Sequence, residues 1–272
     1  MAGKLTVLIP CKNERMNIRP CIESVQSIAD EVLVADSGST DDTLAIVRSI
    51  DGCRLIEREY VCSADFKNWA IPQAAHEWVL IVDADERVTP KLAKEIRRIV
   101  DGADDATKDA YWIGRDNHYL GHPIKRCGWN NDGVVRLVRR DACRYTDRWV
   151  HAEIDAPAER VGRLQGRFVH YTTWDSDHYS RKMVRYAEWG ARNYHQAGKH
   201  PNLLKLALAA PVRFLQLYLL RGGFLDGIPG LQVCMHSAYY SYQKQAKLWE
   251  MHYALPQPDP ELERDNHNQQ AA

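Results

Sequence analysis

Two aspartates one residue apart are the clearest chemical feature of this sequence. Asp83 and Asp85 directly follow an apolar run, VLIV, at positions 79–82. In a strand, residues i and i+2 point to the same side, so both carboxylates would project together from the end of a buried strand. Carboxylate oxygens suit Mg²⁺ or Mn²⁺, and magnesium with few protein ligands takes the others from substrate phosphates. The pair predicts a divalent-cation site, with a solvated turn as the alternative.

Two further polar clusters follow apolar runs. PCKNE occupies positions 10–14 and DSGSTDDT positions 36–43. Asp36 could accept hydrogen bonds from a nucleotide base or ribose, and Gly38 would let the backbone approach a ligand closely. Neither the G-x-G-x-x-G pattern of a dinucleotide fold nor the G-K-[ST] of a P-loop is present. The alternatives are a polar loop for the second cluster and helix capping for the first.

These clusters need strands to position them. Apolar runs predict strands at 4–10, 31–36, 53–59 and 77–85, and helical spacing predicts helices at 17–28, 39–50, 66–74 and 89–100. Ser39 or Thr40 is the expected N-cap of the second helix, and Thr89 with Pro90 is expected to begin the fourth. Strands that alternate with helices indicate an α/β fold with a parallel sheet, in which ligands bind beyond the carboxyl ends of the strands.

The pattern changes beyond residue 110. Segments 110–121 and 133–145 predict longer antiparallel strands, 179–198 an amphipathic helix, and 201–250 apolar helices with a glycine-rich interruption. Residues 203–220 are apolar almost all round, with basic residues interspersed. This segment predicts either a buried helix or an interfacial one that dips into the cytoplasmic leaflet of a membrane. Formation of a homo-oligomer through the same surface is the main alternative to membrane binding.

Composition narrows the function. The chain of 272 residues is 45% hydrophobic and 26% charged, with 36 basic and 36 acidic residues, so net charge gives no support for a nucleic-acid partner. Its seven cysteines are scattered without a C-x-x-C pair, which is typical of reduced thiols in a cytoplasmic protein. The N-terminal MAGKLTVLIP does not match a signal peptide.

Four segments together resemble one enzyme family. VLIPCKNE, VLVADSGSTDDT, KNWAIPQA and WVLIVDADERVTPKL resemble the family 2 inverting glycosyltransferases with the GT-A fold, in order and spacing, over roughly residues 4–100. The later VVRLVRRDACRY, WVHAEI and 213–247 resemble the branch of lipopolysaccharide-core glucosyltransferases. The resemblance implies a Rossmann-like, mostly parallel sheet with helices on both faces. It also implies transfer of a hexose from a nucleotide-diphosphate sugar, by default UDP-glucose, to a lipid-linked glycan.

The resemblance also implies a domain organisation. Residues 1–175 would form the catalytic domain, with a nucleotide-sugar half at 1–100 and an acceptor half at 101–175. Residues 176–255 would form a helical extension that associates with a membrane or with another subunit, and 256–272 a disordered tail. The expected location is the cytoplasmic face of the cell membrane, as a peripheral protein.

Site residues follow from the matched motifs. Asp83 and Asp85 would reach the metal and the diphosphate, and Lys67, otherwise an ordinary surface lysine, would lie near the donor. A sugar that leaves as a nucleoside diphosphate develops negative charge, which a cation stabilises. The residues implied to border the base and ribose are Pro10, Asn13, Glu14, Asp36 and Ser37.

An inverting transfer needs a general base for the acceptor hydroxyl. The region that carries it in the family offers Glu153, with Asp155 and Asp132 as rivals. The branch has adjacent histidine and glutamate, whereas this chain places Ala152 between His151 and Glu153. His151 is a candidate metal or phosphate contact, with a structural histidine as the alternative.

Two other classes of protein remain in competition. A haloacid-dehalogenase-like phosphohydrolase also begins its motif with an apolar strand and D-x-D, but it requires Thr or Val where this chain has Arg87. A non-catalytic nucleotide-sugar-binding protein would keep the fold without a base. The glycosyltransferase interpretation accounts for all the strand-end clusters together.

Overall fold

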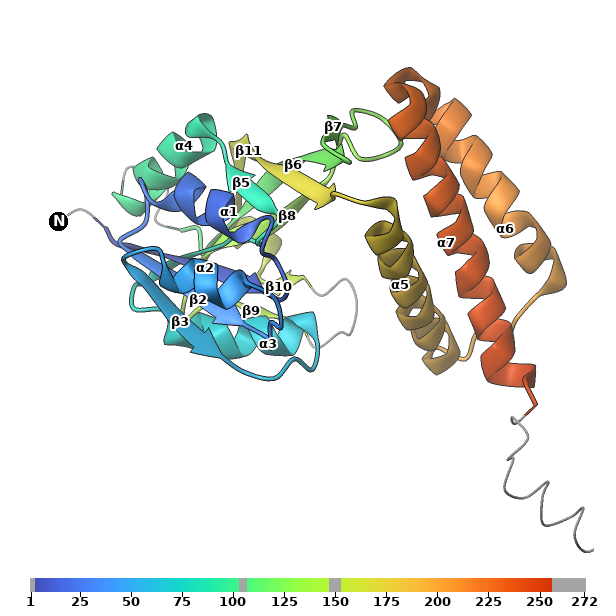
Figure 1. Cartoon of the computed structure of the whole chain (residues 1–272), viewed down its shortest axis with the longest axis horizontal. Coiled ribbons are helices and arrows are strands. Elements are labelled where there is room, and N and C mark those ends of the chain that lie inside the picture. The colour runs from blue at the N-terminus through green and yellow to red at the C-terminus, as the bar shows by residue number, and fades with distance from the viewer. Residues whose placement is uncertain (1–2, 103–106, 147–152, 256–272) are drawn as a thin grey trace, which may run out of the picture.

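A mixed β-sheet forms the centre of the molecule. The computed structural model describes residues 3–102, 107–146 and 153–255. Within these ranges a sheet has the strand order β3-β2-β1-β4-β8-β6-β11-β5, with β7 paired to β6 (Figure 1). The strands are β1 (Leu5–Cys11), β2 (Glu31–Asp36), β3 (Cys53–Glu57), β4 (Trp78–Ile81), β5 (Glu86–Val88), β6 (Ala110–Tyr119), β7 (His122–Pro123), β8 (Gly133–Arg139) and β11 (Val161–Thr173). A separate small hairpin pairs β9 (Arg144–Tyr145) with β10 (Ile154–Asp155).

The first four strands are parallel, as the sequence predicts. The second half of the sheet is mixed, because β8 runs antiparallel to both β4 and β6, whereas β11 is parallel to β6. The antiparallel pairing of 110–121 with 133–145 is therefore confirmed. Parallel strands place their carboxyl ends at one edge, and this edge carries all three polar clusters.

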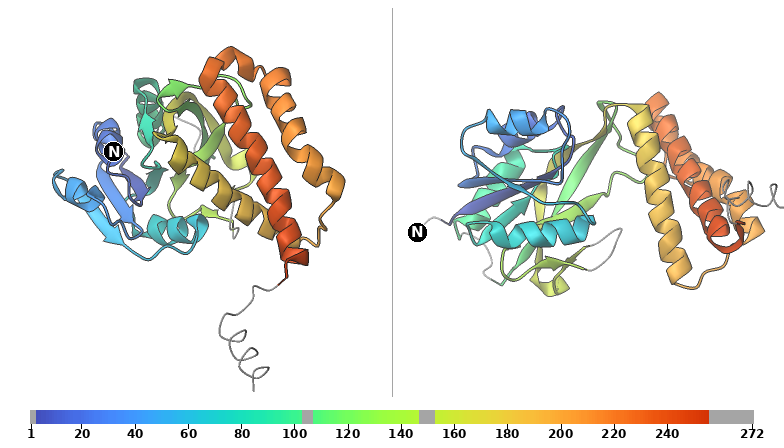
Figure 2. Two further views of the ribbon diagram at one scale, coloured as in Figure 1. Left: turned by 45° about the vertical axis from the view of Figure 1, so that its right-hand side comes forward. Right: turned by 60° about the horizontal axis from the view of Figure 1, so that its bottom comes forward.

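Helices cover both faces of the sheet's parallel half because β1, β2 and β4 are buried on both faces. Leu5, Val7 and Ile9 face one side, where they pack with α1 (Ile18–Val25), α2 (Thr43–Arg48) and α4 (Pro90–Val100). Leu8 and Leu33 face the other side, against α3 (Ser63–Ala70). Figure 2 shows the two layers from further directions.

Two predicted helix starts have different outcomes. Thr89 caps α4 by accepting a hydrogen bond from the Leu92 amide, with Pro90 in the first turn, as predicted. The predicted cap of the second helix is wrong, because α2 begins at Thr43, after the cap residue Asp42. Ser39 instead donates its hydroxyl to Asp36 and so belongs to the loop.

Three long helices follow the sheet: α5 (Ser176–Gln196), α6 (Leu203–Leu215) and α7 (Gly227–Tyr253). A π-helical turn, Gln216–Leu220, and a 3-10 turn, Gly223–Asp226, join the last two. Tyr119 and Cys127 of the sheet region pack with Leu217, Val233 and Cys234, which anchors the helices to the end of β6. By length and composition, Leu203–Leu220 suffices to cross a membrane, and few of its residues are buried. All seven cysteines are free thiols, as expected.

Candidate functional site

The two aspartates lie in a tight turn rather than on a strand. β4 ends at Ile81, and the amide of Glu86 donates to the carbonyl of Asp83 (2.8 Å). The Glu86 carboxylate in return accepts from the Asp83 amide (3.0 Å). A strand was predicted to continue through Asp85, with both carboxylates on one side. The turn instead gives each aspartate a different set of partners.

Asp83 is neutralised by two cations. Its carboxylate accepts from Lys67 Nζ at 2.8 Å and from the guanidinium of Arg136. Burial alone would raise the pKa of Asp83, but Arg136 and Lys67 outweigh it and hold that pKa well below its usual range. Arg136 also donates to the hydroxyl of Tyr145 (2.6 Å), which fixes its orientation. The carboxylate of Asp83 is therefore ionised and already paired.

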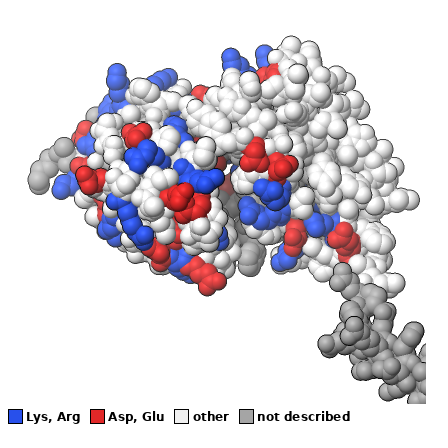
Figure 3. Space-filling model, in the orientation of Figure 1, with Lys and Arg blue, Asp and Glu red and all other residues white. Residues whose placement is uncertain are grey.

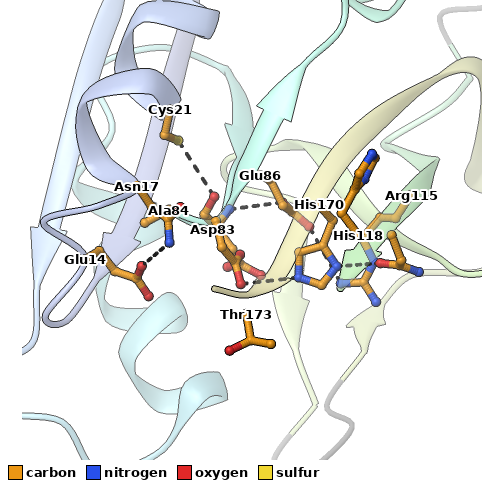
Figure 4. A network of polar contacts seen from close by, with 12 residues as sticks. Glu14, Asn17, Cys21, Asp83, Ala84, Glu86, Arg115, His118, His170 and Thr173 are labelled. Atoms are coloured by element: carbon orange, nitrogen blue, oxygen red, sulfur yellow. Dashed lines mark hydrogen bonds and ion pairs between the residues drawn. The ribbon is translucent and has the colours of Figure 1, made fainter. Parts of the chain in front are cut away.

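Asp85 faces a histidine that the sequence analysis did not single out. Its Oδ2 lies 3.3 Å from Nε2 of His170, on β11. Burial opposes ionisation of Asp85, but the charge and hydrogen bond of His170 outweigh it, so the pKa of the carboxyl is lowered. Figure 4 shows His170 projecting from its strand toward the turn at Asp83 and Glu86.

A chain of hydrogen bonds fixes the tautomer of His170. Asn117 donates its amide to Asp132 (2.8 Å), so its carbonyl oxygen accepts from Nδ1 of His170 at 2.5 Å. Arg115 holds Asp132 with two contacts of 2.9 Å. With Nδ1 donating to Asn117, Nε2 is the nitrogen that faces Asp85: it donates to that carboxylate when it carries a proton, and it offers a lone pair to a cation when it does not. Asp132, a predicted rival for the general base, is ion-paired here with its pKa lowered.

Asp85 and His170 fit a divalent cation as a two-ligand site. Carboxylate and imidazole both bind Mn²⁺, and Mg²⁺ takes carboxylate with most remaining positions filled by phosphate and water. No three His, Cys, Asp or Glu side chains gather as a metal cage within 3–102, 107–146 and 153–255. A cation here would therefore depend on a substrate for further ligands.

The loops after β1 and β2 are tied together. The Asn13 carbonyl oxygen accepts from the amide of Thr40 (2.7 Å), and Ser39 Oγ accepts from the Asn13 amide (2.9 Å). Asp36 is buried and accepts from the amides of Gly38 and Ser39, both at 2.8 Å. These hydrogen bonds hold the loops after β1 and β2 together at the carboxyl edge of the sheet.

Other predicted donor residues line the same edge. Ser37 is buried and donates to the carbonyl of Cys11 (3.1 Å), while Pro10 is half-buried beside Ala35 of β2. Glu14 accepts from Asn17 (2.8 Å), and burial, with the nearby charge of Asp85, raises its pKa to about 7. The structure thus brings Glu14 into the electrostatic field of the Asp83–Asp85 turn.

The predicted base region adjoins this network through Tyr145 of β9, whose hydroxyl accepts from Arg136. Glu153 is exposed, and its amide donates to Thr146 Oγ1 (3.3 Å). Asp155 pairs with Arg144 across the β9–β10 hairpin. No contact among the described residues joins either carboxylate to Asp85. His151 lies outside the described residues.

Comparison with known proteins identifies the fold's family. The family model for glycosyl transferase family 2 matches residues 6–151, more than half of the chain. The chain belongs to glycosyl transferase family 2. This membership agrees with the GT-A architecture and with polar clusters at the carboxyl ends of β1, β2 and β4. The protein is therefore a glycosyltransferase.

Individual relatives span almost the whole chain. The lipopolysaccharide core biosynthesis glycosyltransferase LpsC of Rhizobium meliloti is 29% identical, covering 94% of this chain and 95% of its own. An uncharacterized glycosyltransferase of Rickettsia typhi is 27% identical, covering 91% and 87%. Among solved structures, S. aureus TarS 1-349 in complex with UDP aligns with a TM-score of 0.45 at 15% identity, covering 94% of both chains.

Arg136, His170 and Asn117 are among the site residues that the sequence alone did not reveal. Arg136 was within a quoted motif, VVRLVRR, but no spacing rule linked it to Asp83. His170 and Asn117 lie on adjacent strands, β11 and β6, paired directly in register. Only the strand pairing brings them together, so no local signal in the sequence could have shown it.

Proposed function

We propose that this glycosyltransferase is an inverting, metal-dependent hexosyltransferase that uses a nucleotide-diphosphate sugar, with UDP-glucose as the default donor. The acceptor is a lipid-linked glycan of the lipopolysaccharide-core type, a class supported by the name of the Rhizobium relative. The observation that carries the proposal is the split between the aspartates: Asp83 is ion-paired with Lys67 and Arg136, whereas the Asp85 carboxylate contacts His170 and forms no ion pair with a lysine or arginine among the described residues.

This split suits a diphosphate donor. Asp83, Lys67 and Arg136 hold one another, so Asp83 is oriented and its charge is balanced without any ligand. Asp85 and Nε2 of His170 would hold Mg²⁺ or Mn²⁺, which would neutralise the departing nucleoside diphosphate. The chain Asp132–Asn117–His170 keeps that imidazole in the tautomer that can bind a metal. The loops at 10–14 and 36–43 would receive the base and ribose.

The general base remains assigned to Glu153 in this proposal. Its exposure leaves its carboxylate accessible to an acceptor hydroxyl. His151 is proposed as a metal or phosphate contact on the strength of the motif. Both assignments rest on the family resemblance rather than on contacts with Asp85.

The C-terminal helices are proposed to bind the cytoplasmic face of the membrane, where a lipid-linked acceptor resides. Ten large apolar side chains between Leu203 and Ile228 are at least 44% exposed. We call them the apolar helical surface: Leu203, Leu204, Leu208, Val212, Leu215, Leu219, Leu220, Phe224, Leu225 and Ile228. Figure 3 shows the side of the molecule over α6 and α7 almost free of charged side chains.

An exposed apolar surface of this size favours a lipid or protein partner. Lys205, Arg213 and Arg221 lie in the same segment and suit anionic lipid headgroups. We place the boundary between catalytic domain and extension at residues 175–176, where β11 gives way to α5. Homo-oligomerisation through this surface is the alternative, which sedimentation in the presence and absence of vesicles separates.

A donor screen tests the proposed function. Each nucleotide sugar of a panel is titrated with Mn²⁺ present, and the melting temperature is recorded, because a ligand that binds only the folded state raises it by mass action. The effective donor is then incubated with lipopolysaccharide precursors, and the anomeric configuration of the product is read by NMR. A raised melting temperature with a UDP-hexose, followed by an inverted product, supports the proposal. A retained configuration, or no response to any nucleotide sugar, contradicts it.

A further inference from the structure

Two aromatic rings stack where β11 ends. The ring centroids of Tyr171 and Trp174 are 4.7 Å apart, with their planes inclined by 20°. Trp174 is 45% exposed, yet its indole N–H donates to the side-chain oxygen of Asn17 at 2.8 Å. A large apolar ring that is held on one face and one edge, and still open to water, is a preorganised surface for binding rather than part of a core.

This ring stack is attached to the site from two sides. The amide of Tyr171 donates to the carbonyl of Asp85 (2.8 Å), and His170 precedes it in the chain. Asn17, which holds Trp174, also donates to Glu14 (2.8 Å). The stack is thus coupled to β11 on one side and to the loop before α1 on the other. Its position relative to Asp85 is fixed without a ligand.

Neighbouring side chains surround the Tyr171 ring of the stack, whereas the Trp174 indole stays exposed to solvent. The guanidinium of Arg87 lies 5.5 Å from the centroid of Tyr171, and His118 lies 5.2 Å from it, so that ring is surrounded. Gly121, at the turn after β6, has φ of +78°, and a Cβ there would lie 3.5 Å from Cζ3 of Trp174. The turn therefore passes close to one edge of the indole and does not cover it.

The chemistry of the open ring suits a sugar. An aromatic face carries partial negative charge and attracts the positive edges of C–H bonds. One face of a pyranose presents several C–H bonds in a nearly flat array, with its hydroxyls around the rim. Arg87, which is half-buried beside the stack, brings a guanidinium to that rim.

The position of the stack distinguishes the acceptor sugar from the donor. The loops proposed for the nucleotide follow β1 and β2, whereas Trp174 follows β11, which is on the other side of β4 in the sheet order. Asp85, proposed to hold the diphosphate through a cation, contacts the stack through the Tyr171 amide and lies close enough to Glu14, in the loop after β1, to raise its pKa. An inverting displacement requires the acceptor to approach the anomeric carbon from the side opposite the diphosphate.

We propose that Trp174, stacked on Tyr171, is an acceptor subsite that binds the C–H face of a pyranose ring of the acceptor glycan. This assignment rests on the proposed function, because it requires a glycan acceptor. It adds a residue that positions the acceptor, and it separates acceptor recognition on β11 from donor recognition on β1 and β2.

Kinetics with two substitutions of one residue test the subsite. The acceptor probe is a deacylated, water-soluble lipopolysaccharide-core oligosaccharide, so that membrane binding does not enter the result. Trp174→Ala removes the ring and should raise the KM for the acceptor about tenfold, as expected for loss of an aromatic contact. Trp174→Phe keeps a ring without the N–H and should stay within about threefold of wild type. The KM for the donor should change much less than the KM for the acceptor in either variant.

The matched control is Trp249→Ala. Trp249 is 48% exposed on α7, outside the stack, so its removal should leave both KM values unchanged. An unchanged acceptor KM in Trp174→Ala would overturn the subsite. Equal losses in Trp174→Phe and Trp174→Ala would also overturn it, because the hydrogen bond to Asn17 would then matter rather than the ring.

A binding measurement separates failure of the subsite from failure of the proposed function. Calorimetric titration of the same oligosaccharide is carried out with UDP present, where no transfer takes place. Weaker binding by Trp174→Ala than by wild type supports the subsite, even if wild type transfers no sugar and the proposed function fails. Equal binding by the two proteins, or no binding by wild type, contradicts the subsite, even if transfer is observed.

Discussion

The sheet region and the C-terminal helices expose opposite kinds of chemistry. In the first, charged side chains are buried: the side chains of Lys67 and Arg136 are 9% and 6% exposed beside Asp83. In the second, leucines face solvent, and Leu203 and Leu220 are 82% and 84% exposed. Each arrangement is unfavourable by itself, because buried charges lose hydration and exposed leucines order water.

The two regions compensate for these costs in different ways. The buried charges are matched within the chain, with a pair of cations around Asp83 and a hydrogen-bonded histidine at Asp85. The apolar helical surface has no such partner within the described residues. The site is therefore formed before its ligand arrives, whereas the helices require an external partner. The predictions below separate these two situations, beginning with the largest expected effect.

Removing an ion-pair partner of Asp83 should destabilise the fold strongly. Arg136→Met removes one of the two cations around Asp83, whose side chain is 30% exposed, and leaves Lys67 as the remaining cation. Loss of one partner of a fully buried ion pair costs about 3–5 kcal/mol, so we expect the free energy of unfolding to fall by up to that amount. Urea denaturation followed by circular dichroism measures it.

The control is the same substitution at an exposed pair. Arg48 contacts Glu57 at 3.5 Å, with both side chains more than half exposed. Arg48→Met should change the free energy of unfolding by less than about 1 kcal/mol. If Arg48→Met and Arg136→Met lowered the free energy of unfolding equally, burial of the ion pairs around Asp83 would not explain their contribution to stability.

Charging the apolar helical surface should leave folding intact and weaken membrane binding. Leu204 and Leu215 are 67% and 50% exposed, so glutamate at either position meets water in the free protein. Burying a leucine side chain is worth about 1.5–3 kcal/mol, so each substitution should lower the partition coefficient onto anionic vesicles at least about tenfold. Flotation with phosphatidylglycerol-containing vesicles measures this change.

Both leucine variants should melt within about 2 °C of wild type, because the side chains make little contact with the fold. A large loss of melting temperature would indicate that α6 packs against a part of the protein or a second subunit. Unchanged vesicle binding by both variants would contradict the membrane assignment.

The smallest expected effect concerns Glu14 and pH. Burial and the neighbouring Asp85 raise its pKa from 4.5 to about 7, so the folded state binds the proton more tightly than the unfolded state. The contribution of Glu14 to stability is therefore present below the unfolded pKa and is lost as pH rises through the folded one. Glutamine does not ionise, so Glu14→Gln should not lose stability in this way. Its free energy of unfolding should rise relative to that of wild type by about 1–2 kcal/mol as the pH increases from 5 to 8.

Denaturation of Glu14→Gln and wild type at pH 5, 6.5 and 8 checks this effect. Glutamine keeps an oxygen that can accept from Asn17, so that hydrogen bond is retained. A constant difference between the two proteins across this range would show that Glu14 titrates normally in the folded protein.

Sequence patterns predicted the sheet's parallel half well and its site only in part. Strands β1 to β4 are short apolar runs, and the polar residues that follow them necessarily meet at one edge. The strand predicted through Asp85 ends instead at Ile81, because the turn closed by Glu86 competes with extension. The periodicity of apolar residues carries no information about a turn that is closed by a side-chain hydrogen bond.

The rest of the site depends on strand pairing across long separations. His170 meets Asp85 because β11 pairs with β5, and it meets Asn117 because β11 also pairs with β6. Arg136 reaches Asp83 because β8 joins the sheet next to β4. The order of β8, β6 and β11 is not encoded in any single segment, so these partners could be found only in the folded chain.

Donor binding by the Asp85 variant tests the central claim most directly. Calorimetric titration of UDP-glucose into wild type, with and without Mn²⁺, should show binding that weakens at least about tenfold when the metal is omitted. Asp85→Asn should bind weakly in both conditions while keeping the wild-type melting temperature within about 3 °C. Metal-dependent binding of equal strength in wild type and Asp85→Asn would contradict the assignment of Asp85 as the cation-holding aspartate.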